Sequence, residues 1–263
     1  MISAIVDEEN EELRVEVADG LAVLTIDRPR ARNAIGLRTM DALERALDGL
    51  AEQPLGALVV RGAGEGAFVS GGDLKELSQI RDEDGAIAMA TRMRGLLDRV
   101  ATFPAPVIAA VNGHALGGGA EVAVAADLRV AADDIRIGFT QVQLGIMPAW
   151  GGAERLAELV GRSRALLLIG TGRVLEAAEA ERAGLVDVVA PRESFEATWR
   201  ALAAEFASLP TGAGAAIKEV ISAARPNDHP ALEGAAVRRF AKLWVGEEHW
   251  RAADALAAAR SRA

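Results

Sequence analysis

The sequence contains no cysteine and only three histidines. Without cysteine the chain can form no disulfide, no thiolate metal site and no cysteine nucleophile, and this composition suits a reducing compartment. An H-E-x-x-H pattern, a paired histidine cluster and a phosphate-binding P-loop are also absent from the sequence. Metal-dependent and ATP-dependent chemistry therefore have no support in the sequence, and we expect no metal site.

Positive charge is also scarce, since Lys+Arg number 29 against 38 Asp+Glu, giving a formal net charge of -9. Surfaces that bind nucleic acids or anionic membranes usually carry clustered Lys and Arg, so we expect neither partner. Acidic residues occupy Met1 to Glu12, where a secretory signal would be basic and then apolar. The longest uncharged stretch, Phe103 to Ala120, is interrupted by prolines and glycines. We expect a cytoplasmic protein.

Short apolar strands alternate with helical patterns up to about residue 150, which indicates an α/β fold whose sheet is covered on both faces. An antiparallel pair is predicted over Leu13 to Val17 and Leu21 to Ile26, joined by a turn at Asp19-Gly20. Helices are predicted over Leu37 to Leu50 and Gly85 to Val100, with buried strands at Ala57 to Val60, Val107 to Val111 and Leu128 to Ala131.

After about Gly151 the composition shifts toward Ala, Leu, Glu and Arg with helical periodicity, and Leu185 to Val189 is the one strand expected there. We therefore divide the chain into a core over residues 1–200 and a helical segment over residues 201–263, which we expect to pack on a partner subunit.

Two glycine-rich turns, each following an apolar run and opening a helix, are candidate binding elements. Gly117, Gly118 and Gly119 precede one predicted helix, and Gly71-Gly72 precede another with Asp73 placed as its N-cap. Bare backbone at a helix N-terminus leaves N–H groups available to an anion. If the two loops meet, their N–H groups can form an oxyanion hole; otherwise they are two ordinary helix starts.

Three segments in this order and spacing resemble the crotonase, or enoyl-CoA hydratase/isomerase, family: Phe68 to Leu77, Val107 to Asp127 and Leu144 to Leu156. The resemblance runs from about Val15 to Arg260. It implies a spiral of ββα units with a helical C-terminal segment, assembled as a homotrimer or a dimer of trimers. It also implies a coenzyme A thioester as substrate and no separate cofactor.

By the same resemblance, the N–H groups of Gly72 and Gly118 form the oxyanion hole for the thioester carbonyl. Two fixed donors at a helix N-terminus stabilise the charge of a thioester enolate as it develops. The arginines Arg28, Arg30 and Arg32 are candidates for binding the phosphates of coenzyme A. A neighbouring subunit is a further source of pocket residues, with Phe240 and Lys242 as the candidates.

Hydratases of this family use two glutamates, and only the first is present. Glu121 matches the first, whereas Gln141, which cannot titrate, stands where the second is expected. The segment Pro148 to Gly152 resembles the branch that contains ethylmalonyl-CoA decarboxylase, with Trp150 shaping an apolar pocket. Decarboxylation of a short branched malonyl-CoA-type thioester is thus the first hypothesis. Hydration of a 2-enoyl-CoA by Glu121, with Gln141 orienting the water, and non-catalytic acyl-CoA binding are the alternatives.

Overall fold

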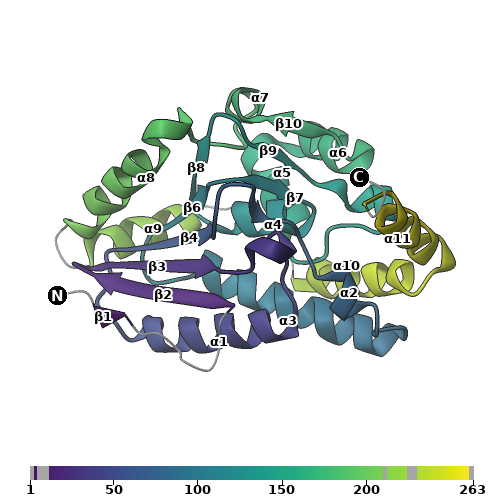
Figure 1. Cartoon of the computed structure of the whole chain (residues 1–263). Helices are drawn as coiled ribbons and strands as arrows, with labels where there is room; N and C mark the ends of the chain where they lie inside the picture. The colour runs from purple at the N-terminus through teal and green to yellow at the C-terminus, as the bar shows by residue number, and fades with distance from the viewer. Residues whose placement is uncertain (1–2, 5–11, 210–211, 224–229, 261–263) are drawn as a thin grey trace.

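Two β-sheets form the centre of the computed structural model, which describes residues 3–4, 12–209, 212–223 and 230–260 (Figure 1). The larger sheet contains, in spatial order, β1 (Ser3–Ala4), β2 (Leu13–Ala18), β3 (Leu21–Ile26), β4 (Ala57–Gly62), β6 (Val107–Val111), β8 (Leu128–Ala132) and β11 (Val188–Ala190). The smaller sheet contains, again in spatial order, β10 (Val174–Glu176), β9 (Arg136–Gly138), β7 (His114–Leu116) and β5 (Ala67–Val69).

Helices cover the sheets and extend beyond them toward the C-terminus (Figure 1). They are η1 (Pro29–Ala31), α1 (Leu37–Ala51), α2 (Leu74–Leu77), α3 (Glu83–Ala101), α4 (Gly118–Ala125), η2 (Thr140–Leu144), α5 (Gly152–Val160), α6 (Arg162–Thr171), α7 (Ala177–Arg182), α8 (Arg192–Ala207), α9 (Ala213–Ala223), α10 (Pro230–Trp244) and α11 (Glu247–Arg260). Helix α1 packs on β2 and α3, whereas α8 packs on β3, β4, β6, β8 and β11.

A strand–strand–helix unit repeats along the chain. Strands β4, β6 and β8 pair in parallel in the larger sheet, and the strand that follows each of them, β5, β7 or β9, pairs in parallel in the smaller sheet. Each second strand is followed by helices before the chain returns to the larger sheet. This arrangement is the predicted α/β spiral of ββα units.

The N-terminal hairpin also has the predicted form. Strands β2 and β3 pair antiparallel from Leu13 opposite Ile26 to Ala18 opposite Leu21. Asp19 and Gly20 both have positive φ values, 51° and 77°, as a two-residue turn that matches the twist of the strands requires.

The C-terminal part differs from the sequence expectation in two places. The expected strand over Leu185 to Val189 begins only at Val188, and a second strand, β10, was not expected at all. Strand β10 has three residues and pairs along β9, so its extended form depends on a neighbour distant in sequence rather than on its own pattern. Residue 200, at which the core is divided from the helical segment, lies within α8, and α10 packs on α3. The division itself stays a prediction.

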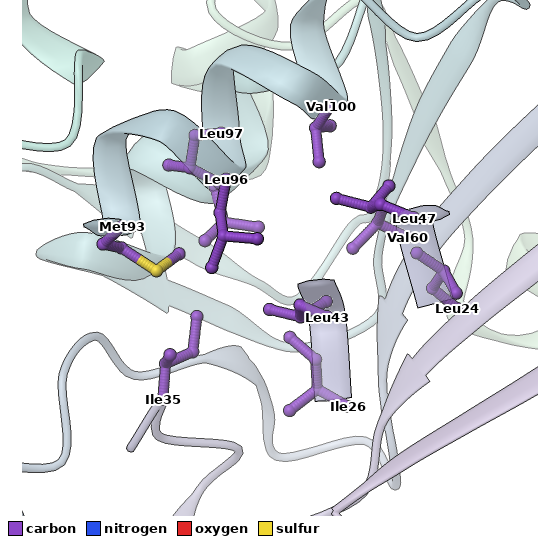
Figure 2. Close-up of a pocket in the computed structure, with 11 residues that line it drawn as sticks. Leu24, Ile26, Ile35, Leu43, Leu47, Val60, Met93, Leu96, Leu97 and Val100 are labelled. Atoms are coloured by element: carbon purple, nitrogen blue, oxygen red, sulfur yellow. The ribbon is translucent and has the colours of Figure 1, made fainter. Parts of the chain in front are cut away.

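Between α1, α3 and the larger sheet lies a small apolar void of about 20 Å³. Figure 2 shows Met93, Leu96, Leu97 and Val100 on one helix, with Leu43 and Leu47 among the side chains that line the void with them. Its lining residues are all apolar, so the void offers no partner to a water molecule and belongs to core packing.

We expect Leu47→Ala to lower the free energy of unfolding by about 2–5 kcal/mol, because Leu47 is fully buried and its removal enlarges the void. Urea unfolding monitored by circular dichroism measures this loss. Leu37→Ala is the control on the same helix, since Leu37 is 39% exposed and a change of about 0.5 kcal/mol is expected there. Equal losses in the two variants would contradict this account of the core.

Candidate active site

Helix α4 begins where the backbone of two segments lies in direct contact. Its N-cap, Gly117, has a φ of 57°, a conformation that favours glycine. A Cβ atom on Gly119 would lie 1.7 Å from the carbonyl oxygen of Val69 in β5, so no side chain fits there. The N-terminus of α4 therefore lies directly against the smaller sheet.

The two glycine turns meet at this point. A Cβ atom on Gly71 would lie 3.2 Å from the backbone nitrogen of Gly118. Ile35 N–H donates to the carbonyl of Gly71, and Asp73 N–H donates to the carbonyl of Ile35, so this bridge leaves the N–H of Gly72 unused. The N–H of Gly118, in the first turn of α4, has no intrahelical acceptor. Within the described residues, neither N–H group donates to a backbone carbonyl.

The indole of Trp150 packs against both turns. A Cβ atom on Gly118 would lie 2.3 Å from the ring of Trp150, and one on Gly72 would lie 3.6 Å from it. Trp150 is buried and lines the cavity described below, as does the neighbouring Ala149. The side chain of Trp150 thus contacts both Gly72 and Gly118, whose N–H groups are the predicted donors of the oxyanion hole.

Glu121 lies on the first turn of α4 and is 2% exposed. Its Oε2 accepts hydrogen bonds from the backbone N–H groups of Trp150 (2.8 Å) and Gly152 (2.9 Å). Its Oε1 accepts a hydrogen bond from Nε2 of Gln141 (2.9 Å). These three donors come from two segments that the sequence separates from Glu121 by at least 20 positions, and together they fix the orientation of the carboxyl group.

Burial raises the pKa of Glu121 to about 7, because the charged form loses its hydration. The hydrogen bonds from Gly152, Trp150 and Gln141 act in the opposite direction and lower the pKa, while the charge of Glu154 raises it further. A carboxyl group with a pKa near neutrality can both accept and donate a proton at physiological pH.

Gln141 belongs to the short helix η2 and is buried beside Glu121. Its amide nitrogen donates to Glu121, whereas its Oε1 is buried without a hydrogen-bond partner. A buried unpaired acceptor is costly unless a ligand or water supplies the missing donor. The structure therefore brings together Glu121, Gln141, Gly72, Gly118 and Trp150, which sequence reasoning selected separately.

These residues open onto a cavity of about 1740 Å³. Its walls include the two glycine turns, η2 and one side of α11, including Trp250, Ala253 and Leu256. Phe240, considered above as a contribution from a neighbouring subunit, lines the cavity of its own chain, and Lys242 is exposed and outside the lining. The cavity is large enough for a ligand much larger than a simple acyl group.

Comparison with known proteins identifies the family of the chain. The sequence model of the enoyl-CoA hydratase/isomerase family matches residues 16–248. The chain belongs to the enoyl-CoA hydratase/isomerase family. The match confirms the resemblance to crotonases and makes the chain an enzyme of a family that acts on acyl-CoA thioesters.

Individual members of the family resemble the chain over most of its length. A probable enoyl-CoA hydratase of Rhizobium meliloti is 39% identical over 216 residues, covering 81% of this chain and 81% of that protein. The crystal structure of an enoyl-CoA hydratase from Bacillus anthracis superimposes with a TM-score of 0.79 at 34% identity, covering 88% of this chain and 89% of the other. An enoyl-CoA hydratase structure from Mycobacterium avium subsp. paratuberculosis gives a TM-score of 0.84 at 28% identity, covering 92% and 98%.

The three arginines nominated for the coenzyme A phosphates differ in their surroundings. Arg28 donates to Asp73 Oδ2 (2.9 Å) and to the carbonyl of Ala34. Its guanidinium therefore stabilises the turn that contains Gly71 and Gly72. Arg32 is exposed and lines the cavity, whereas Arg30 is exposed but lies outside the lining. Arg32 is thus the best placed of the three, and phosphate binding by any of them stays a prediction.

Two further features bear on function. Within residues 3–4, 12–209, 212–223 and 230–260, no three His, Asp or Glu side chains are grouped closely enough to hold a metal ion. No helix in the same ranges is both long and apolar enough to cross a membrane.

Sequence reasoning missed several residues of the site. The backbone donors at positions 150 and 152 act through N–H groups, which every residue except proline carries, so no side-chain pattern reveals them. The sequence also gives Trp250 no role, and only the fold places it at the cavity with Phe240 and Trp244.

The raised pKa of Glu121 predicts a pH-dependent difference in stability between the wild type and Glu121→Gln. Between pH 4.5 and 7 the folded state keeps a proton that the unfolded state releases, so this carboxyl's contribution to stability falls as pH rises. We expect the wild type to lose on the order of 3 kcal/mol relative to Glu121→Gln between about pH 5 and about pH 8. Urea unfolding of both proteins across this range measures the difference, and parallel curves would contradict the assignment.

Proposed function

We propose that this member of the enoyl-CoA hydratase/isomerase family adds water to a 2-enoyl-CoA thioester, with Glu121 as its single acid–base group. The observation that carries the proposal is the pair of acceptor oxygens at the centre of the site. Glu121 Oε1 accepts only the hydrogen bond from Gln141 among the described residues, and Gln141 Oε1 has no partner. One water molecule has two O–H groups and can donate to both acceptors.

In this reaction Glu121, in its ionised form, takes a proton from the water as the water oxygen bonds to the β-carbon. The π electrons of the double bond move toward the thioester and place negative charge on its carbonyl oxygen. The N–H groups of Gly72 and Gly118 are proposed to donate to that oxygen. Glu121 then returns the proton to the α-carbon, so the carboxylate is regenerated and atoms and charge balance.

The named relatives support the same proposal. The Rhizobium meliloti protein and the Bacillus anthracis and Mycobacterium avium structures all carry the name enoyl-CoA hydratase. We therefore rank hydration ahead of decarboxylation, the reaction that the motifs around Trp150 favour.

Decarboxylation of a short malonyl-CoA-type thioester is the second candidate, and the pKa of Glu121 favours it. When carbon dioxide leaves, the electrons of the broken carbon–carbon bond stay on the α-carbon and form an enolate. Only one proton must then be delivered, to that α-carbon. Glu121, with a pKa of about 7, is protonated in a large fraction of molecules at neutral pH and can supply that proton. The opposing factor is that a substrate carboxylate would lie near the acceptor oxygens of Glu121 and Gln141.

Product analysis by mass spectrometry separates these reactions. Purified protein is incubated with crotonyl-CoA, ethylmalonyl-CoA and methylmalonyl-CoA, with Glu121→Gln as the control. A product that has gained one water supports hydration, and loss of carbon dioxide supports decarboxylation. Tight acyl-CoA binding with no Glu121-dependent turnover would overturn both and leave the non-catalytic alternative.

The two reactions also predict opposite pH dependences. Hydration needs ionised Glu121, so kcat/KM is expected to rise with pH through about 7, whereas decarboxylation needs the protonated form and its rate is expected to fall there. Gln141→Glu is expected to increase hydration and to move the rising limb to higher pH, because two neighbouring carboxyl groups oppose each other's ionisation. Steady-state kinetics of the wild type and this variant test both points. A slower variant would count against a water-binding role for position 141.

Assembly as a homotrimer or a dimer of trimers also remains a proposal, supported by an exposed apolar face on α9. Ile217, Val220 and Ile221 are 57%, 72% and 66% exposed and share one face of the helix. We expect Val220→Glu to shift the protein toward smaller species in analytical ultracentrifugation, with Glu219→Ala as the control. An unchanged sedimentation coefficient for Val220→Glu would exclude this face from the interface.

A further inference from the structure

The junction between α10 and α11 places four aromatic rings beside the site. This tail cluster consists of Phe240, Trp244, His249 and Trp250. The ring centroid of Trp244 lies 5.5 Å from that of Phe240, 4.6 Å from that of His249 and 5.2 Å from that of Trp250. Phe240, Trp244 and Trp250 also line the cavity. The cluster is therefore in contact with the chamber that contains Glu121.

His249 connects this cluster to the short helix that carries Gln141. Its Nδ1 lies 2.8 Å from the carbonyl oxygen of Leu144, the last residue of η2. A carbonyl oxygen can only accept, so Nδ1 carries the proton and donates. His249 is fully buried. Burial lowers its pKa and the charge of Arg81 lowers it further, while the hydrogen bond to Leu144 acts in the opposite direction.

Helix η2 needs such support because it is only five residues long and of the 3-10 type. Hydrogen bonds in these helices have poor geometry, and the last carbonyl groups of any helix lack intrahelical partners. His249 supplies a donor to one of these groups. Its backbone also lies near the end of η2, since a Cβ atom on Gly145 would be 3.5 Å from the backbone nitrogen of His249. The position of η2, and with it of Gln141, thus depends on α11.

The tail cluster also contacts the loop after α2, the helix that follows the turn at Gly71-Gly72. The indole N–H of Trp244 donates to the carbonyl of Ile80 (2.9 Å), shortly after α2. The guanidinium of Arg81 lies 3.5 Å from the ring centroid of Trp250, a distance at which cation–π attraction contributes. The tail therefore contacts both segments that bring site residues to the cavity, one leading from Gly72 and one containing Gln141.

We infer that His249 is a positioning residue for this reaction: by donating to the carbonyl of Leu144, it holds η2 so that the amide of Gln141 is directed at Glu121. The inference rests on the proposed function for its effect on rate. Its effect on the carboxyl group of Glu121 is independent of which substrate is turned over.

The test compares three variants. His249→Phe keeps a ring of similar size but removes the donor, whereas His249→Asn places an amide N–H close to the position of Nδ1. Arg251→Ala, on an exposed residue of the same helix, is the matched control. We expect His249→Phe to lower kcat about tenfold with KM changed by less than about twofold, since misplacement of an orienting group affects rate more than binding. His249→Asn is expected to recover most of the rate.

Titration of Glu121, followed by carboxyl ¹³C NMR with Glu121→Gln used to assign the signal, provides a readout that needs no turnover. We expect His249→Phe to raise the pKa of Glu121, because the hydrogen bond from Gln141 that lowers it is weakened. His249→Asn should leave the titration close to that of the wild type. Thermal unfolding of each variant establishes that it is folded.

Two results would overturn the inference. An unchanged rate and titration in folded His249→Phe would show that the hydrogen bond does not position Gln141. A loss in His249→Asn equal to that in His249→Phe, in both readouts, would assign the effect to ring packing. If the wild type instead turned over none of the thioesters, the proposed function would fail, while the titration of Glu121 would still decide the role of His249.

Discussion

The contact between Gly119 and the carbonyl of Val69 is the constraint on which the site depends. Because the backbone of α4 lies directly against β5, the first turn of the helix is fixed relative to the smaller sheet. That approach brings the two glycine turns together, and Glu121, two residues further along the helix, is buried in the interior. Any side chain at position 119 would separate the two segments, and the geometry of the site would be lost with them.

Glu121 is a buried carboxyl group whose cost is only partly offset by its hydrogen bonds. Three donors stabilise the ionised form, yet burial still raises the pKa to about 7. This balance is useful for catalysis, since the group exchanges protons near neutral pH. The turn over Trp150 and Gly152 acts on one side of this balance, because its two N–H groups donate to Glu121 Oε2 and lower the pKa.

The C-terminal helices complete the chamber of the same chain. Helix α10 packs on α3, and α11 contacts η2, so the aromatic cluster at their junction is in contact with both loops of the site. A helical tail expected to serve mainly for subunit contact therefore also forms a wall of the cavity. The exposed apolar face of α9 lies outside this wall.

Patterns in the sequence are enough to predict the alternating α/β pattern, the hairpin turn at Asp19-Gly20, the two glycine turns and the family. The elements and turns follow from local patterns such as periodicity and the Asp-Gly pair, and the family follows from the order of motifs along the chain. The folded chain is needed to show that the turns meet, that Gln141 donates to Glu121, and that His249 reaches the carbonyl of Leu144, 105 positions away. Contacts between distant segments depend on packing of the whole chain, and the backbone groups that take part in them carry no mark in the sequence.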